Sequence, residues 1–296
     1  MKDAAVSAAQ TDVLHTLADY IALTKPRLNV LVVATSTAGF YLGAVAPISP
    51  LTLIATVVGT TLVAGGAAAL NQLYERHTDG LMPRTRMRPL PDGRVSPSEA
   101  LVFGLLLSAA GLALLFLYST WTASLLALAT LVIYLLVYTP LKLRSPIATL
   151  VGAVPGALPP LIGWTAARGL TPGGISLFLI VFVWQIPHFM AISWMYRDDY
   201  AAGGFPMLAV IDPSGKRAAQ QAVGYAAALV PISLIPVIVG LSGVVYAGVA
   251  TVLGAALLVL ALRFGASRSD AAARWLFFGS LLYLPLLWVV MIADKR

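Results

Sequence analysis

The sequence has no cysteine, only three histidines and few charged residues. Without cysteine the chain has no disulfides, no thiolate metal sites and no thiol nucleophile. Asp, Glu, Lys and Arg make up 10% of the residues, where soluble domains carry about a quarter. Hydrophobic residues make up 59%, and the mean hydropathy is +0.88. A soluble fold cannot bury that much apolar surface, so the composition predicts an integral membrane protein.

Nine apolar runs in the sequence are each long enough to cross a bilayer, which takes about 20 residues of helix. They predict an all-α, polytopic membrane protein built as one helical bundle. We expect a single nine-helix domain over 28–296, preceded by a cytoplasmic N-terminal segment, 1–27. The runs cover residues 28–46, 51–73, 100–118, 121–140, 147–165, 174–195, 219–241, 243–263 and 273–292.

Positive charge lies in the short segments between these runs rather than in one patch. The net charge of +7 is therefore better explained by membrane topology than by nucleic-acid binding. With the first run entering from the cytoplasm, only Arg168, Lys295 and Arg296 of the 19 basic residues fall outside. The positive-inside rule then places the N-terminus in the cytoplasm. The first residues lack the apolar core and cleavage site of a secretory signal.

The connections between the runs are unequal in length and polarity. The outer ones are minimal, whereas two cytoplasmic connections, about 74–99 and 196–218, are long and polar. Each of these two loops opens with carboxylates. The active site is therefore expected on the cytoplasmic face, between these two loops.

The first acidic motif lies where the second apolar run ends. Asn71, Glu75 and Asp79 are four residues apart, so a helix places them within about 80° of one another. Two carboxylates at this spacing repel each other unless a cation lies between them. Such oxygen ligands suit Mg²⁺, which takes one or two carboxylates together with phosphate oxygens. The alternative is a solvated helix end with Gly80 as its C-terminal cap.

A basic, proline-rich segment, 82–94, follows directly. It carries four arginines, among them Arg84 and Arg88, and three prolines. Arginine binds phosphate oxygens bidentately, and the prolines reduce the entropy lost when the loop becomes ordered. Beside two carboxylates, these arginines predict a site for a diphosphate and a metal ion. The alternative is that they serve only to enforce membrane topology.

The second acidic motif, Arg197-Asp198-Asp199, follows the sixth run. Adjacent carboxylates on a helix point about 100° apart, so at most one of them faces the first motif. The sequence leaves open which one does. Two acidic clusters on the same face, each with arginines, favour a prenyl diphosphate as substrate. Basic residues and a metal ion would stabilise the leaving pyrophosphate, while the apolar bundle shields the allylic cation from water.

These motifs resemble those of the UbiA-type intramembrane prenyltransferases, whose first motif is Asn-x-x-x-Asp-x-x-x-Asp and whose second is rich in Asp. Within that family the chain looks like the branch that acts on haem. The likeness is carried by residues 71–93, 138–142, 156–164, 184–189, 199–200 and 204–208. The chain departs from the pattern at Glu75, His77, Ala148 and the adjacent pair Asp198 and Asp199.

The resemblance implies nine helices around a central cavity and a reaction of haem B, farnesyl diphosphate and water that gives haem O and pyrophosphate. It implies Mg²⁺ as cofactor, a bacterial inner membrane, and haem A synthase or haem-copper oxidase assembly as partner. The residues that it assigns are Asn71, Glu75, Asp79, Asp198 and Asp199 for Mg²⁺ and catalysis, and Arg84, Arg88, Lys142 and Arg197 for the diphosphate.

His188 lies inside the sixth run and would distinguish haem from other acceptors. Imidazole is a common ligand of haem iron, and an ionisable side chain within a span is a candidate for function. The histidine lies about 15 Å along a helix from Asp198, so the macrocycle would lie deeper than the diphosphate. The alternative is a neutral histidine bonded to a neighbouring helix, near the carbonyl that Pro187 frees.

Two other functions fit parts of the pattern. A prenyltransferase with an aromatic acceptor, such as a quinone precursor, shares the same motifs and is favoured if haem does not bind. A transporter also uses paired acidic motifs and broken helices. Transport sites lie near the bilayer midplane, however, whereas these carboxylates cluster at one helix end.

Overall fold

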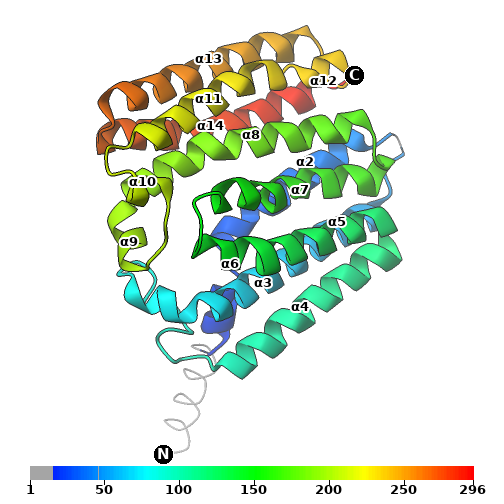
Figure 1. Ribbon diagram of the computed structural model, residues 1–296. Coiled ribbons are helices and arrows are strands. Elements are labelled where there is room, and N and C mark those ends of the chain that lie inside the picture. The colour runs from blue at the N-terminus through cyan, green and yellow to red at the C-terminus, as the bar shows by residue number, and fades with distance from the viewer. Residues whose placement is uncertain (1–15, 46) are drawn as a thin grey trace, which may run out of the picture.

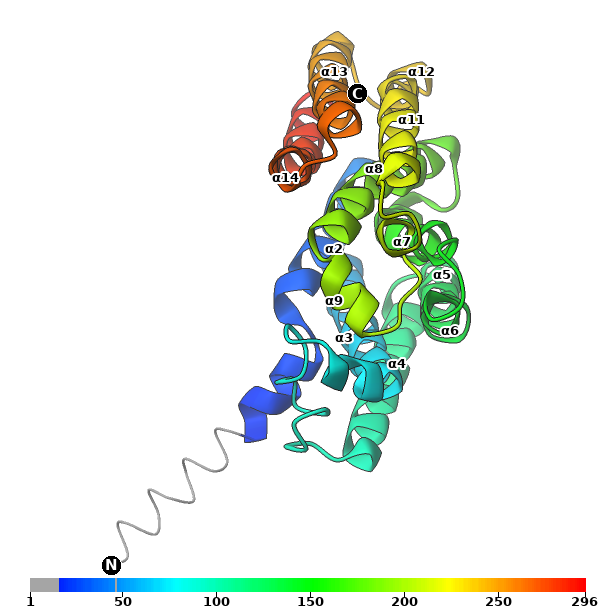
Figure 2. The same ribbon diagram turned by 60° about the vertical axis from the view of Figure 1, so that its left-hand side comes forward.

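The computed structural model describes residues 16–45 and 47–296. These residues form helices joined by turns, and one isolated bridge between Ser242 and Lys295 is the only β pairing among them. The long helices lie side by side as one elongated bundle, with α13 at one edge and α4 at the other (Figures 1 and 2). The fold is all-α, as predicted.

The helices follow the predicted apolar runs closely, and residues 16–23 are helical as well. The bounds are α2 Pro26–Gly43, α3 Pro50–Leu81, α4 Pro97–Tyr118, α5 Trp121–Val132, the π-helix η1 Ile133–Tyr138, α6 Thr139–Lys142, α7 Ala148–Arg168, α8 Pro172–Met195, α9 Arg197–Ala202, α10 Leu208–Ile211, α11 Lys216–Ile232, α12 Ile235–Ile238, α13 Val244–Ser267 and α14 Asp270–Ala293.

Eight helical stretches of the described chain are long and apolar enough to cross a membrane, with α5 to α6 and α11 to α12 each counted as one. They correspond to eight of the nine predicted runs, so the chain is a multi-pass membrane protein. The remaining run, 28–46, is the 18-residue helix α2, which packs along α7 and α3. The count of nine spans, the domain limit at residue 27 and the cytoplasmic N-terminus stay predictions.

Local signals in the sequence set where several helices begin. Proline lies in the first turn of α2, α3, α4 and α8, where its missing N–H costs no helical hydrogen bond. Ser96 and Glu99 form a capping box at the start of α4. Ser49 and Thr120 cap α3 and α5 through their hydroxyls. These helices therefore begin where first-turn prolines and capping side chains place them.

Small residues let α2 and α7 approach each other closely. A Cβ at Gly39 of α2 would lie 2.1 Å from the carbonyl oxygen of Pro160 in α7. A Cβ at Gly163 of α7 would lie 1.7 Å from the carbonyl oxygen of Ser36 in α2. Membrane helices associate through such contacts because lipid supplies little hydrophobic drive between them. Larger side chains at either glycine would push the two helices apart.

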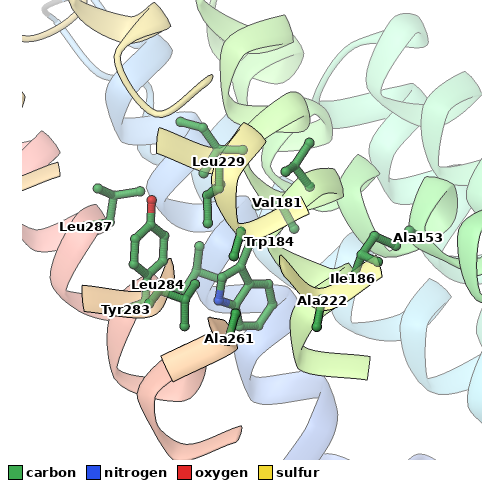
Figure 3. Close-up of a cluster of buried hydrophobic side chains, with 14 of the residues drawn as sticks. Ala153, Val181, Trp184, Ile186, Ala222, Leu229, Ala261, Tyr283, Leu284 and Leu287 are labelled. Carbon is green, nitrogen blue, oxygen red and sulfur yellow. The ribbon is translucent and has the colours of Figure 1, made fainter. Parts of the chain in front are cut away.

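The main buried cluster lies in the second half of the chain, between α8, α11, α13 and α14. Figure 3 shows Trp184 of α8 beside Tyr283 and Leu284 of α14, with Leu229 of α11 close by. The indole N–H of Trp184 donates to the backbone carbonyl of Ser280 at 2.8 Å, which ties α8 to α14. This cluster is the scaffold from which α8 carries the second acidic motif.

Both predicted active-site loops lie at one end of the bundle. Figure 1 shows α6, α9 and the turns that follow α3 gathered there. Helix α3 extends to Leu81, well beyond the predicted run 51–73, whereas α8 ends at Met195 and the chain restarts as the short helix α9. The first acidic motif is therefore carried by one long helix, and the second follows a break.

Candidate active site

Asn71, Glu75 and Asp79 form a buried polar column on one face of α3. Their exposed fractions are 2%, 4% and 1%. Because α3 continues to Leu81, all three side chains project from a single helix at four-residue intervals. The column is thus not a solvated helix end, although Gly80 beside it is exposed.

Each carboxylate of the column is bonded to a cation from another segment. Lys142 Nζ lies 3.0 Å from Glu75 Oε1, and Arg88 Nη1 lies 2.7 Å from Asp79 Oδ2. The hydroxyl of Thr85 donates to the backbone carbonyl of Asp79 at 2.7 Å, which holds the arginine-rich turns against the end of α3. A buried carboxylate needs such a partner, because an isolated charge away from water is strongly unfavourable.

The side-chain amide of Asn71 is held in one orientation. Thr139 donates its hydroxyl proton to the carbonyl of Tyr134 at 2.7 Å, so its oxygen accepts from Asn71 Nδ2 at 3.2 Å. The Oδ1 atom of Asn71 then faces Lys25, whose ammonium group donates to it at 3.1 Å. Asn71 is therefore bonded on both sides and presents its carbonyl oxygen toward a cation.

The π-helical turn η1 places Lys142 and Thr139 against α3. A π turn inserts a residue into the helix and changes which side chains face a neighbour. The ring of Tyr138, the last residue of η1, packs on Gly152 of α7, where a Cβ would lie 2.6 Å from ring atoms. The same ring lies 6.0 Å from Lys142 Nζ. An irregular helix thus supplies two of the partners of the polar column.

Lys25 contacts the column but was not predicted from the sequence, because a lysine before a span also suits a topological role. It lies in the corner before α2, outside the membrane-spanning helices. Loss of hydration and, after it, the charge of Arg88 lower the pKa of its ammonium group to about 8, against the opposing effect of Glu75. The one sequence signal for Lys25 is its position next to Pro26, at the cytoplasmic entry of the first run.

The two active-site loops touch through a small hydrophobic cluster of Met82, Phe205 and Met207. Gly204 has φ +71°, a conformation that suits glycine and turns the chain so that Phe205 is buried. The ring of Phe205 also lies 4.6 Å from Lys142 Nζ, a cation–π distance. The loop after α8 therefore packs against Lys142, one of the cations bonded to the column.

Asp199, and not Asp198, pairs with the basic segment that follows the first motif. Arg84 Nε lies 3.7 Å from Asp199 Oδ2, which links the turns after α3 to α9. Asp198 is exposed. The guanidinium group of Arg84 also lies 5.0 Å from the ring centre of Tyr196. The structure thus brings Arg88 and Lys142 to the column, joins Arg84 to Asp199 across the two loops, and leaves Asp198 exposed.

Arg197 is not brought to the column. Its Nη1 atom lies 2.7 Å from Asp270 Oδ1 at the start of α14 and donates to the carbonyl of Trp194 at 2.8 Å. Its guanidinium group lies 4.7 Å from the ring centre of Trp194. In the described structure Arg197 fastens the end of α8 to α14, which differs from the predicted diphosphate contact.

His188 is held among aromatic rings at the interface of α8 and α14. Its ring stacks on Trp184 and Phe277 at centroid distances of 5.1 Å and 5.0 Å. His188 Nδ1 lies 2.8 Å from Ser280 Oγ, whose proton is donated to the carbonyl of Phe277 at 2.7 Å. Nδ1 therefore carries the proton of a neutral imidazole, and Nε2 keeps its lone pair. This is the arrangement that the sequence offered as the alternative to a haem ligand, a neutral histidine bonded to a neighbouring helix. Its Nε2 atom can nevertheless bind a metal ion.

A groove runs along α2, α3 and α4 and reaches Thr24 and Pro26 on either side of Lys25. It has a volume of about 860 Å³ and no charged residue in its lining. Val33, Thr37, Leu62, Gly65 and Leu107 from α2, α3 and α4 are among the lining residues. None of the predicted site residues lines this groove, so the polar chemistry is not located there.

The donor set of the column fits Mg²⁺, since it consists of carboxylate and amide oxygens. Among the residues described, no three His, Cys, Asp or Glu side chains converge as a ready-made metal site. Mg²⁺ commonly binds one or two carboxylates and takes its other ligands from water and phosphate. The arrangement therefore suits a metal ion that arrives with a diphosphate more than an ion held permanently by protein ligands.

The fold and this site define a multi-pass, all-helical membrane protein with paired carboxylates and cations at one end of the bundle. Residues 32–283 match the UbiA prenyltransferase family, and the chain belongs to that family.

Curated relatives match almost the whole chain. It is 44% identical to the protoheme IX farnesyltransferase of Solibacter usitatus over 94% of this chain and 98% of that protein. It is 46% identical to the enzyme of the same name from Opitutus terrae, over 94% of each chain. The mitochondrial protoheme IX farnesyltransferase of Arabidopsis thaliana is 43% identical over 90% of this chain and 62% of that protein.

Solved structures share the fold at low sequence identity. A digeranylgeranylglyceryl phosphate synthase superposes with a TM-score of 0.81 at 17% identity, over 95% of this chain and 98% of that one. A UbiA homologue from Archaeoglobus fulgidus, bound to GPP and Mg²⁺, gives a TM-score of 0.67 at 16% identity, over 93% and 99% of the two chains. These likenesses show that the helical arrangement is the family's fold.

Proposed function

We propose that this protein transfers the farnesyl group of farnesyl diphosphate to a vinyl group of haem B, giving haem O and pyrophosphate. The observation that carries the proposal is the 44% identity with a protoheme IX farnesyltransferase across nearly the full length of both chains. The polar column on α3 supports it, because the column pairs carboxylates with cations as diphosphate chemistry requires. The protein would thus be a protoheme IX farnesyltransferase.

The reaction needs no protein nucleophile, in agreement with a chain that has no cysteine. The bond between C1 of the farnesyl group and the diphosphate oxygen breaks, and its electron pair leaves with the diphosphate. The π electrons of the haem vinyl group form the new C–C bond to C1. Water then adds to the resulting cation and loses a proton, which leaves a hydroxyl group on the side chain. The bundle limits premature capture of the farnesyl cation by water.

The residues that hold the diphosphate are those at the end of the bundle. We assign Lys142, Arg88 and Arg84 to its oxygens, because each lies among the carboxylates of the two motifs. Asn71, Glu75, Asp79 and Asp199 would hold Mg²⁺. When bound, the metal ion would neutralise charge that develops on the leaving pyrophosphate. A UbiA homologue of the same fold from A. fulgidus has been solved with GPP and Mg²⁺ bound, which is consistent with a prenyl diphosphate and this metal ion as the pair to test.

His188 is assigned to the haem. Its Nε2 lone pair, with Nδ1–H bonded to Ser280, is the arrangement by which a second residue orients a metal-binding imidazole. The stacked rings of Trp184 and Phe277 provide apolar surroundings that suit a porphyrin edge. We further assign the active site to the cytoplasmic face of a bacterial inner membrane, with haem A synthase or a haem-copper oxidase receiving the product.

The test is to incubate the purified protein in detergent with haem B, farnesyl diphosphate and Mg²⁺, and to separate the haems by chromatography with mass detection. We expect hydroxyethylfarnesyl haem, and we expect its formation to stop when Mg²⁺ is chelated. Release of pyrophosphate with an aromatic acceptor, while haem stays unchanged, would assign the chain to the quinone-precursor type of prenyltransferase instead.

A further inference from the structure

Lys25 lies at the corner between residues 16–23 and α2, and its backbone is left-handed, with φ +50°. A residue other than glycine seldom adopts this conformation, and it is unusual before a proline. Two neighbouring side chains fix the corner to α3: Gln72 donates to the carbonyl of Leu23 at 2.7 Å, and Asn71 accepts from Lys25 at 3.1 Å. The strained corner thus delivers one ammonium group to the polar column.

Lys25 differs from the other cations of the column in what it contacts. Lys142, Arg88 and Arg84 each face a carboxylate, whereas Lys25 bonds the neutral amide of Asn71. The described residues place no carboxylate within ion-pair distance of Lys25. The column and its bonded partners therefore hold three cations and two carboxylates, and the surplus positive charge is that of Lys25. A part-buried cation of this kind is stabilised by an anion.

We propose that Lys25 binds the prenyl diphosphate, with its ammonium group donating to a phosphate oxygen beside Asn71. The proposal rests on the proposed function, because the diphosphate is the anion that this reaction brings to the column. An ammonium group has three N–H donors, so Lys25 can keep its bond to Asn71 and still donate to phosphate. Lys25 would then complete the diphosphate site from the N-terminal side of the bundle, opposite the loop after α8.

Arg27 provides a matched control. It lies two residues from Lys25, carries the same charge, and is exposed. It has no ion pair within the described chain. Removing the charge of Arg27 therefore changes the number of cytoplasmic positive charges and the electrostatic potential at the corner by about as much as removing the charge of Lys25 does.

The experiment measures binding of Mg²⁺-pyrophosphate and of an unreactive farnesyl thiodiphosphate to the full-length protein by calorimetry. Lys25→Gln should weaken both by about 10–100-fold, the effect of losing a hydrogen bond to a charged group, while Arg27→Gln changes them less than about twofold. Lys25→Arg keeps the charge and should recover most of the affinity. Haem binding, followed by absorbance, should be the same in all three variants.

The outcomes separate the two proposals. Unchanged affinity in Lys25→Gln, with a lowered melting temperature, would mean that Lys25 only fastens the corner to α3, and the inference would be wrong. An equal loss in Arg27→Gln would mean a general field effect and would also overturn it. If the unmodified protein binds the thiodiphosphate but never modifies haem, the function assigned above falls, and the Lys25 comparison still stands.

Discussion

The two acidic motifs have similar composition, but the chain holds them in different ways. Asn71, Glu75 and Asp79 project from one uninterrupted helix, are buried, and are each bonded to a cation. Asp199 lies on a six-residue helix after a break, and its ion pair with Arg84 is 3.7 Å long. The first motif is thus preorganised by the bundle, and the second is brought to it by a loop. Substitutions in the first should therefore have the larger effects.

The largest effect is expected for Glu75→Gln. The change removes a carboxylate from the centre of the column and leaves Lys142 facing a neutral amide. We expect kcat/KM for farnesyl diphosphate to fall by about 10²–10³-fold, as for other preorganised charge-stabilising groups. Steady-state assays of haem O formation measure this, with thermal unfolding in detergent to show that the bundle is intact. Normal turnover in this variant would show that Glu75 is not part of the active site.

A smaller and asymmetric effect is expected in the second motif. Asp199→Asn should lower kcat/KM by about 10–100-fold, because Asp199 faces Arg84 across the two loops. Asp198→Asn is the matched control, since Asp198 is adjacent and exposed, and it should change the rate less than about twofold. The reverse order of the two effects would mean that α9 turns when substrate binds, and that the described orientation is not the catalytic one.

Substitutions at His188 and its partner Ser280, inside the bundle, should affect haem binding without affecting diphosphate binding at the polar end. We expect His188→Ala to raise the dissociation constant for haem by about tenfold and to leave pyrophosphate binding unchanged. Ser280→Ala should also raise the dissociation constant for haem, but by less, because the serine only orients the ring of His188. Haem titrations followed by absorbance test both variants. Unchanged haem binding in His188→Ala would give the residue a structural role alone.

The smallest effect is expected at Arg197. Its partner is Asp270, so Arg197→Gln should change the KM for farnesyl diphosphate less than about twofold, whereas Arg84→Gln should raise it about fivefold. Both arginines are partly exposed, so the loss of either charge is screened by solvent to a similar extent. A larger effect at Arg197 would indicate that its ion pair with Asp270 opens during the reaction.

Much of the fold could be predicted from the sequence because a membrane span has a strong local signal. Length and hydropathy place eight stretches correctly, and prolines or capping residues mark the starts of several of them, among them α4 and α8. The π-helical turn η1 could not be predicted, because its sequence, Ile133–Tyr138, is as apolar as the helix before it. Its last residue, Tyr138, packs closely on Gly152 of the next long helix, a tertiary contact that the apolar pattern does not reveal.

The candidate site was predictable where one helix carries it and not where segments meet. The four-residue spacing is enough to place Asn71, Glu75 and Asp79 on one face. The choice between Asp198 and Asp199 depends on how α9 turns after α8 ends, which no local pattern encodes. Lys25 contacts the column although this was not predicted, and Arg197 does not although it was predicted to. Both residues are basic and lie beside a span, which is also typical of a residue that only sets membrane topology. Only the tertiary structure shows that the partner of Lys25 is Asn71 and that of Arg197 is Asp270.

The central claim is that the column on α3 and the loop after α8 form one diphosphate site. A structure of the protein with Mg²⁺ and the unreactive farnesyl thiodiphosphate tests it most directly. We predict the diphosphate between Lys142, Arg88 and Lys25. The metal ion should lie on Asn71, Glu75 and Asp79 of α3 and on Asp199 of the loop after α8. A diphosphate bound away from α3, with the pairs of Lys142 with Glu75 and Arg88 with Asp79 unchanged, would contradict the account.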